Sequence, residues 1–316
     1  MEKKVDPSVS MIILNYNGLN YTVKCLESLL RIDYNNYRLI VVDNASDKNE
    51  AEEIERLFKQ EITVIRNDRN YGYSEGNNTG IKFALERFDP KYVLIFNNDQ
   101  VAHPDFLKEL VAVAELAPSI GIAGPRTYYM DYPDILWGEG GRIYWYVGWN
   151  GLRRQGKKYK PKRYRYAEVD FVAGSCMLIK TEVIRKIGVL PTEYFLQWED
   201  VDYCTAAKRA GFNIVYVPSA IVWHKVSASM NVIVREKKIE ATFRGYRNRV
   251  MFFTKYLRGV NFAVFMLTFP LIMVPLLTFN YVFLHKDPKQ AKWMLSGVTE
   301  GARIAWRRWK AKNSSI

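Results

Sequence analysis

The fold of this chain is constrained most by four short runs that are rich in Val and Ile. The stretches that separate these runs have apolar residues at helical spacing. The runs cover residues 9–14, 38–42, 62–65 and 92–96. Such runs are typical of parallel strands that are buried on both faces. The stretches between them predict helices over 21–31, 51–58 and 76–88, with Asn20 as a candidate N-cap. This alternation predicts an α/β domain on a doubly wound, mostly parallel sheet.

The second half of the chain adds weaker signals. We expect regular structure to resume over 169–180, followed by a helix over about 201–210 that ends at Gly211. A further strand is predicted over 213–217.

Polar residues follow three of the predicted strands directly. They are Asn15-Tyr16-Asn17-Gly18, Asp43-Asn44-Ala45-Ser46 and Asn97-Asn98-Asp99. Each group alone is typical of a turn or a helix cap. Ligands of doubly wound sheets bind beyond the carboxyl ends of the strands. The recurrence of polar groups at these ends therefore predicts one shared ligand site.

Two of these side chains, together with His224, have the chemistry of a nucleotide and metal site. Asp43 can accept a hydrogen bond from the ring N–H of uracil or thymine. Asp99 offers a hard oxygen ligand for Mg²⁺ or Mn²⁺, with Asn97 or Asn98 in support. His224 follows a strand and is a candidate second ligand, although a single histidine is more often structural.

Three acidic residues, Glu199, Asp200 and Asp202, lie at the start of a predicted helix. Acids at this position also stabilise a helix through its macrodipole, so a purely structural role remains open. Trp198 precedes them directly, and a carboxylate beside apolar rings is partly desolvated and becomes a better general base. The cluster is therefore a candidate for catalytic acid–base chemistry.

The C-terminal part of the chain carries most of its charge. Residues 235–316 contain 16 Lys and Arg against four Asp and Glu, and the whole chain has a net charge of +13. Within this part, residues 261–284 contain no charged side chain. This uncharged run is long enough to cross a hydrocarbon core. Pro270 and Pro275 are expected to break the helix, so a helix–break–helix in one leaflet, a single span and a buried core helix remain alternatives.

The cysteines and the N-terminus indicate in which cellular compartment the catalytic part lies. Cys25, Cys176 and Cys204 are widely spaced and form no CxxC pair, which favours neither a disulfide framework nor a zinc cluster. The first residues are charged rather than apolar, so no secretory signal is expected. The sequence thus predicts a catalytic part in a reducing, cytoplasmic environment.

Taken in order, the motifs resemble those of glycosyltransferase family 2, particularly its rhamnosyltransferases and galactofuranosyltransferases. They are IILNYNG, VVDNAS, NYGYSEGNN, IFNNDQV, FVAGSCMLI, WEDVDYCTAAKRAGF and WHKVSAS, and they cover about residues 8–250. The resemblance implies a Rossmann-like GT-A fold, an inverting single displacement and a nucleotide-sugar donor. It also implies a divalent cation, Mg²⁺ or Mn²⁺.

The resemblance assigns roles to individual positions. Asp43 matches the base-binding acid, Asp200 the catalytic base and Glu199 its neighbour, which orients it or contacts the acceptor. Asp99 matches the last acid of a DXD-like metal triplet whose first acid is replaced here by Asn97, and His224 matches a downstream metal ligand.

The predicted substrate contacts rest on this resemblance, on the polar strand ends and on the acidic cluster. The donor-binding positions are Asn15, Asn17, Asp43, Asn44, Gly72, Gly76, Asn77, Asn78 and Asn98; the acceptor-binding positions are Trp198 and Asp202. Arg247-Asn248 matches an RN pair that is common after the catalytic domain.

The sequence as a whole predicts a catalytic domain over residues 1–235 and a basic helical tail over 236–316 that associates with a membrane through 261–284. The expected enzyme is a metal-dependent hexosyltransferase at the cytoplasmic face of the cell membrane, peripheral, monotopic or with one C-terminal span. Its donor would be a dTDP- or UDP-linked sugar, and its acceptor a glycan or a polyprenyl-diphosphate-linked sugar, with no role for nucleic acid.

Two alternatives belong to other classes. A nucleotidyltransferase would normally show a Gly-rich, basic phosphate loop after the first strand, which NYNG does not provide. A nucleic-acid-binding protein without catalysis would explain the basic charge, but here the charge flanks an apolar run.

Overall fold

The computed structural model describes residues 6–161, 165–225 and 235–313. The described residues form two compact units. The first contains those of 1–142, 152–195 and 199–229, and the second contains those of 143–151, 196–198 and 230–316. The predicted boundary at residues 235 and 236 stays a prediction, because the second unit also takes in two short segments from earlier in the chain.

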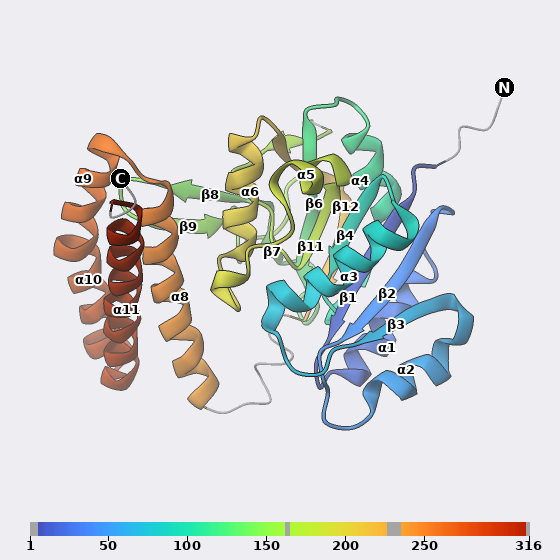
Figure 1. Ribbon diagram of the computed structural model, residues 1–316, viewed down its shortest axis with the longest axis horizontal. Coiled ribbons are helices and arrows are strands. Elements are labelled where there is room, and N and C mark those ends of the chain that lie inside the picture. Colours follow the sequence, from blue (N-terminus) through green and yellow to red (C-terminus); the bar gives the residue numbers. More distant parts are fainter. Residues whose placement is uncertain (1–5, 162–164, 226–234, 314–316) are drawn as a thin grey trace. The chain divides into compact units, whose positions relative to one another are not determined.

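The first unit is built on a ten-stranded mixed sheet (Figure 1). Eight strands follow the order β10-β12-β6-β11-β4-β1-β2-β3, while β5 pairs with β12 and β7 pairs with β6. Their bounds are β1 (Val9–Asn15), β2 (Tyr37–Asp43), β3 (Ile62–Arg66), β4 (Tyr92–Phe96), β5 (Gln100–Ala102), β6 (Ile120–Tyr129), β7 (Leu136–Gly138), β10 (Ala167–Glu168), β11 (Cys176–Lys180) and β12 (Asn213–His224). The strands β3, β2, β1 and β4 are parallel, and β11 is antiparallel to both of its neighbours.

Helices cover both faces of this sheet. They are α1 (Leu19–Leu29), α2 (Glu50–Phe58), α3 (Gly72–Phe88), α4 (Phe106–Ala114), α5 (Thr181–Ile187) and α6 (Glu199–Arg209), with short 3₁₀ turns η1 (Lys59–Glu61) and η2 (Thr192–Tyr194). Residues of α1, α2 and α4 share one core with Met11, Ile13 and Leu94. On the other face, Gly80 of α3 lies so close to Ile12 that an added Cβ would come within 2.6 Å of its side chain.

The predicted strands and helices of the first hundred residues are confirmed, and for β1, β2 and β4 the reason is burial on both faces. All five residues of β4 are buried, as are the last five of β2. Strands covered on both sides by helices read as continuous apolar runs rather than as alternating ones. The α/β fold class is confirmed.

Two local predictions were wrong. Asn20 does not cap α1, because the helix begins at Leu19 with Gly18 as its N-cap. The free N–H groups of Gly18 and Leu19 instead donate to the Glu50 carboxylate, at 2.9 and 3.1 Å. The strand predicted to end at residue 217 continues to His224 through an irregularity between Val217 and Ile221.

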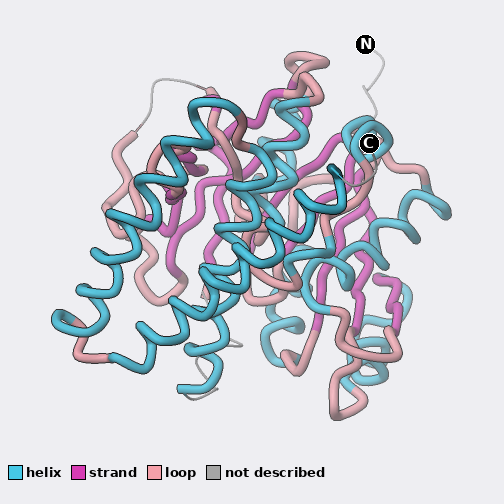
Figure 2. Tube along the Cα trace, turned by 60° about the vertical axis from the view of Figure 1, so that its left-hand side comes forward, coloured by secondary structure: helices cyan, strands magenta, loops and turns pink. Residues whose placement is uncertain are grey.

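The second unit is mainly helical (Figure 2). Its helices are α8 (Arg235–Tyr256), α9 (Gly259–Thr268), α10 (Val274–Phe279) and α11 (Pro288–Asn313), with π-helical turns η3 (Phe269–Met273) and η4 (Asn280–Leu284). Strands β8 (Gly141–Tyr144) and β9 (Trp149–Leu152) form a separate two-stranded sheet.

The prediction that prolines break the apolar run was wrong. The segment Gly259–Leu284 is helical throughout and is long and apolar enough to cross a membrane. Pro270 lies in the π turn η3, and Pro275 follows it in α10. A proline removes one main-chain N–H and crowds the preceding turn. The wider π turn accommodates this within a continuous helix.

Candidate active site

Asn15 and Asp43 meet at the carboxyl ends of the neighbouring parallel strands β1 and β2. The side-chain amide of Asn15 donates to Asp43 Oδ1 at 2.8 Å and to Glu50 Oε2 at 2.9 Å. Ser46 donates to the same carboxylate, from its hydroxyl to Oδ1 at 2.6 Å and from its main-chain N–H to Oδ2 at 3.1 Å. This network fixes the Asp43 carboxylate in one orientation and leaves capacity on Oδ2 for a further donor.

Asn17 lies at the rim of the same strand ends. Its main-chain N–H donates to Ser46 Oγ at 2.9 Å, and its side chain exchanges two 2.8 Å hydrogen bonds with Asp47. Its φ of 51° is left-handed, a conformation that Asn adopts more readily than most residues. Asn17 therefore joins the loops that follow β1 and β2, and its direct contact with a donor stays a prediction.

Asn44 and Asn78 use their amides to hold loops. Asn44 donates to Asn70 Oδ1 and to the carbonyl oxygen of Gly72, and it accepts from Asn67 and from the main-chain N–H of Tyr71. Asn78 exchanges two hydrogen bonds with the main chain of Leu190. Both side chains are fully buried, so these bonds indicate a positioning role for two of the predicted donor-binding residues.

The loop that begins α3 is shaped by its glycines. Gly72 has a φ of 79°, and an added Cβ would come within 2.7 Å of the Phe195 ring. At Gly76 an added Cβ would lie 2.7 Å from Leu14. Asn77 is buried and donates to the carbonyl oxygen of Tyr73, while its own side-chain oxygen has no hydrogen-bond partner. That buried, unused acceptor is the part of this loop that is best suited to a ligand.

Tyr73 connects the end of β4 to the segment that supports Asp200. Its hydroxyl donates to the carbonyl oxygen of Gly174 at 2.8 Å and lies 3.2 Å from Asn97 Oδ1. The main-chain N–H of Gly174 in turn donates to Asp200 Oδ2 at 2.9 Å. Burial, followed by the nearby carboxylates, raises the pKa of Tyr73 well above its usual value, so its hydroxyl remains a donor.

Asn98 connects the end of β4 to Thr22 and Asn15. Its amide donates to Thr22 Oγ1 at 2.9 Å and lies 3.5 Å from Asn15 Oδ1. The predicted clusters after β1, β2 and β4 are thus brought together by direct side-chain contacts.

Asp99 and His224 form the candidate metal site. The two side chains are almost fully buried, and His224 Nε2 lies 3.0 Å from Asp99 Oδ1. The Trp137 ring meets the imidazole edge-on at 4.8 Å between centroids. A carboxylate oxygen and an imidazole nitrogen that converge in this way fit a divalent cation of the Mn²⁺ type.

This pair would be only part of a coordination shell. No group of three or more His, Cys, Asp or Glu side chains suited to a metal occurs within residues 6–161, 165–225 and 235–313. Mg²⁺ takes about six ligands and usually keeps several waters or substrate oxygens among them. The residues therefore fit a cation whose remaining ligands would come from a bound diphosphate and water.

Glu199 and Asp200 are adjacent carboxyls with different environments at the N-terminus of α6. Asp200 accepts main-chain hydrogen bonds from Gly174 and from Val201, at 2.9 and 2.8 Å, whereas Glu199 Oε2 is buried without a hydrogen-bond partner. Burial, together with the neighbouring Asp200, raises the pKa of Glu199 from 4.5 to about 8. Burial also raises the pKa of Asp200, and its main-chain hydrogen bonds oppose that rise.

These environments favour different protonation states for the two carboxyls. Hydrogen bonds that favour the charged form make Asp200 the member that ionises first. The raised pKa of Glu199 favours its protonated form at neutral pH.

The two predicted acceptor-binding residues are both buried. Asp202 Oδ2 accepts a 2.5 Å hydrogen bond from the Tyr194 hydroxyl, which indicates a structural role. Trp198 belongs to the second unit, where its ring packs against Phe252 at 5.2 Å and Phe253 at 5.7 Å. Contact of either residue with an acceptor stays a prediction.

The structure also identifies residues that the sequence analysis did not single out. Glu50 anchors Asn15 and the start of α1, Tyr73 bridges two loops, and Gly174 supports Asp200 through its main chain. Tyr73 lies inside the NYGYSEGNN motif, which was the one available signal. Glu50 and Gly174 act through partners 35 and 26 residues away, and such pairings leave no local pattern.

Comparison with known proteins identifies the family. The model of a family described as glycosyltransferase-like family 2 matches residues 7–245. An uncharacterized protein of Sinorhizobium fredii is 32% identical over 239 residues, which are 71% of this chain and 25% of that protein. The chain thus spans about a quarter of that relative's length.

Two relatives carry named activities. The low-salt glycan biosynthesis hexosyltransferase Agl10 of Haloferax volcanii is 28% identical over 77% of this chain and 74% of its own length. An N-acetylglucosaminyl-diphospho-decaprenol L-rhamnosyltransferase of Mycobacterium tuberculosis is 23% identical over 68% of this chain and 75% of its own.

Solved structures share the GT-A fold. GalNAc-T7 with UDP, GalNAc and Mn²⁺ superposes with a TM-score of 0.64 at 15% identity, over 83% of this chain and 50% of that one. The mannosyltransferase PcManGT of Pyrobaculum calidifontis, in complex with GDP-Man and Mn²⁺, gives 0.56 at 14% identity, over 99% and 84%. The protein belongs to glycosyltransferase family 2.

Proposed function

We propose that this protein is an inverting, metal-dependent hexosyltransferase that moves a sugar from a nucleotide-diphosphate donor to a hydroxyl of an acceptor glycan. The observation that carries the proposal is the Asp200 carboxylate, which two main-chain N–H groups hold beside Glu199, whose pKa is raised to about 8. A general base needs a fixed position and an ionised carboxylate, and these contacts favour both.

The donor side of the proposal rests on the strand ends. Asp43 would accept the ring N–H of uracil or thymine, so the donor would be UDP- or dTDP-linked. Asn15, Ser46 and Glu50 hold its carboxylate ready for that contact. Pre-organised polar groups of this kind fix orientation in small-molecule sites.

The proposed reaction is a single displacement. Asp200 removes the proton from the acceptor hydroxyl, whose oxygen forms a bond to the anomeric carbon as the bond from that carbon to the diphosphate oxygen breaks. When bound at Asp99 and His224, a divalent cation would supply positive charge to the departing diphosphate. Glu199 would keep its proton and orient Asp200 or donate a hydrogen bond to the acceptor.

The proposed acceptor and location rest on one relative and on one helix of this chain. The name of the M. tuberculosis relative refers to a diphospho-decaprenol-linked sugar. The segment Gly259–Leu284 is apolar and largely exposed. We therefore assign this enzyme a polyprenyl-diphosphate-linked or polysaccharide acceptor and a place at the cytoplasmic face of the membrane.

Screening nucleotide sugars tests the function. The purified protein would be heated with UDP- and dTDP-linked hexoses, with and without Mn²⁺, since a ligand that binds the folded state raises the melting temperature. We expect one donor to stabilise the protein only with Mn²⁺ and to be transferred to a lipid-linked acceptor. Stabilisation by nucleoside triphosphates with release of diphosphate would favour a nucleotidyltransferase instead.

A further inference from the structure

The helical C-terminal unit exposes a large apolar surface along Gly259–Leu284. Only 11% of its most apolar 18-residue window is buried. Side chains with more than half of their surface exposed include Val260, Leu267, Leu271, Leu276 and Phe283. A contiguous apolar surface of this kind marks a contact with a partner or a membrane.

Length alone would permit this segment to span a bilayer. Its 26 residues form a continuous helix. At a rise of about 1.5 Å per residue such a helix measures roughly 39 Å, which exceeds the hydrocarbon thickness of about 30 Å. Length therefore does not decide how Gly259–Leu284 is oriented in a membrane, and the elements that pack beside this helix do.

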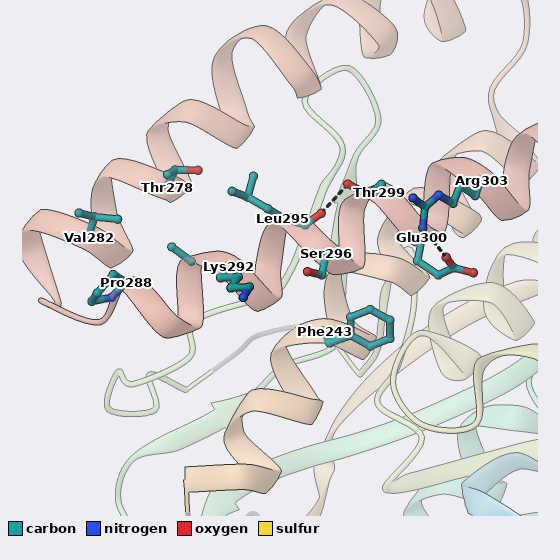
Figure 3. A pocket seen from close by; sticks show the side chains of 11 residues that line it. Phe243, Thr278, Val282, Pro288, Lys292, Leu295, Ser296, Thr299, Glu300 and Arg303 are labelled. Carbon is teal, nitrogen blue, oxygen red and sulfur yellow. Dashed lines mark hydrogen bonds and ion pairs between the residues drawn. The ribbon is translucent and has the colours of Figure 1, made fainter.

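A polar helix runs back along this segment. After the turn at residues 285–287, α11 returns beside α10 and η4, and the two sides enclose a groove of about 650 Å³ (Figure 3). Thr278 and Val282 line one wall of this groove, while Lys292, Glu300 and Arg303 line the other. The charged side chains of α11 thus lie alongside the apolar helix and not beyond its end.

The helix α11 is tightly joined to α8. An added Cβ at Gly297 would lie 2.3 Å from the carbonyl oxygen of Phe243, and one at Gly301 would lie 2.6 Å from that of Arg247. The backbones of the two helices are therefore in direct contact. α8 carries its own ion pair, between Arg244 and Glu240.

A spanning orientation of Gly259–Leu284 would place the charges of α11 at the depth of the hydrocarbon core. Charged side chains at that depth are costly and rare. An orientation in the plane of the membrane avoids this, because the apolar surface enters one leaflet while the charges remain at the headgroups.

The end of α11 has the composition of a membrane interface. Trp306 and Trp309 stack at 5.0 Å and are 63% and 57% exposed. Arg307, Arg308 and Lys310 lie among them. Indole rings favour the headgroup level, and cations favour anionic lipids.

We propose that α9, α10 and α11 form a hairpin that lies in one leaflet of a membrane with anionic headgroups and that does not cross it. This inference rests on the membrane association proposed above and specifies its mode. It excludes a single C-terminal span.

Two single-cysteine variants, one at each end of Gly259–Leu284, test whether this segment lies in one leaflet or crosses the membrane. Arg258→Cys and His285→Cys would be labelled in sealed membrane vesicles with a membrane-impermeant maleimide. Lys48→Cys, at an exposed position of the first unit, marks the side on which that unit lies. The native Cys25, Cys176 and Cys204 are buried, so labelling of the wild-type chain measures the background from native cysteines.

We expect all three variants to be labelled from the same side of the vesicle. Labelling of Arg258→Cys and His285→Cys from opposite sides would overturn the in-plane mode and leave membrane association intact. Recovery of the full-length protein in the soluble fraction, as a monomer or as a dimer that covers the apolar surface, would overturn the association itself.

Flotation with vesicles tests the headgroup preference. Vesicles of phosphatidylcholine alone would be compared with vesicles that also contain phosphatidylglycerol. We expect at least a several-fold increase in bound protein with the anionic lipid at low salt. Equal flotation with both would overturn the assignment of the basic end of α11 to anionic headgroups.

Discussion

The side-chain amide of Asn248 donates a 2.9 Å hydrogen bond to the carbonyl oxygen of Gln197, a residue held in the left-handed region with a φ of 69°. The same amide donates to the carbonyl oxygen of Leu196, and Trp198 is also left-handed, with a φ of 79°. Bulky residues are strained in this conformation and keep it only where other contacts enforce it. The turn continues directly into Glu199, so we predict that Asn248 helps to position the carboxyl pair.

Replacing Asn248 by Ala should therefore lower kcat by about 10²-fold, as expected for a misplaced catalytic group, while donor binding changes little. The measurement is kcat and the donor Kd for Asn248→Ala and for the control Asn36→Ala, whose exposed amide also donates to a carbonyl oxygen. A folded Asn248→Ala variant with unchanged kcat would contradict the positioning role.

The metal hypothesis predicts different effects for two histidines. His224 lies 3.0 Å from Asp99, whereas His103 is 41% exposed and lies near Asp105. His224→Ala should raise the Mn²⁺ concentration needed for half-maximal activity, and Asp99→Ala should abolish transfer, because the diphosphate loses its counter-charge. His103→Ala is the control and should leave the Mn²⁺ requirement unchanged. Titrations of activity with Mn²⁺ for the three variants check this. If His224→Ala gave the same titration curve as His103→Ala and the wild type, His224 would be structural.

The hydroxyl of Tyr194 should contribute to stability rather than to activity. It donates to the buried Asp202, and hydrogen bonds to charged groups contribute about 1.5–3 kcal/mol to the free energy of unfolding. Tyr194→Phe should lose stability of this order in urea unfolding while keeping the acceptor KM. Tyr144→Phe, at an exposed position, is the control. A raised acceptor KM with unchanged stability would instead support the predicted acceptor contact of Asp202.

The pKa of Glu199 predicts a pH dependence of stability. The folded protein keeps this proton up to about pH 8, whereas an ordinary glutamate releases it near 4.5. Since the folded state binds more protons in this window, the free energy of unfolding should fall as the pH rises from about 4.5 to about 8.

Glu199→Gln removes the titrating group and should flatten that part of the profile. Urea unfolding across the window, with the exposed Glu86→Gln as the control, measures it. An unchanged slope in Glu199→Gln would show that Glu199 is already ionised in the folded protein.

Much of the fold was predictable because the parallel strands are mostly apolar. Met11 and Ile12 lie on opposite faces of the sheet and are both buried, so the strands are visible as unbroken runs. The polar ends of the strands then predicted that Asn15, Asp43 and Asn98 meet, and their side chains form one hydrogen-bonded network.

The features that the sequence did not predict depend on distant contacts. Glu50 replaces the expected cap of α1 from 32 residues away, and Asn248 stabilises left-handed residues that no local preference favours. The unequal pKa values of Glu199 and Asp200 arise from burial and from the N–H of Gly174, neither of which is visible in a run of acidic residues.

The comparison of Asp200→Asn with Glu199→Gln tests the central claim most directly. Asp200→Asn keeps the size of the side chain and removes its basicity, so turnover should fall by roughly 10²–10⁴-fold, the usual contribution of a positioned base. The Kd of the nucleotide-sugar donor, measured with Mn²⁺ present, should stay near that of the wild type, and Glu199→Gln should lose less turnover. If Asp200→Asn weakened donor binding as much as it slowed turnover, or if Glu199→Gln were the more damaging change, Asp200 would not be the base.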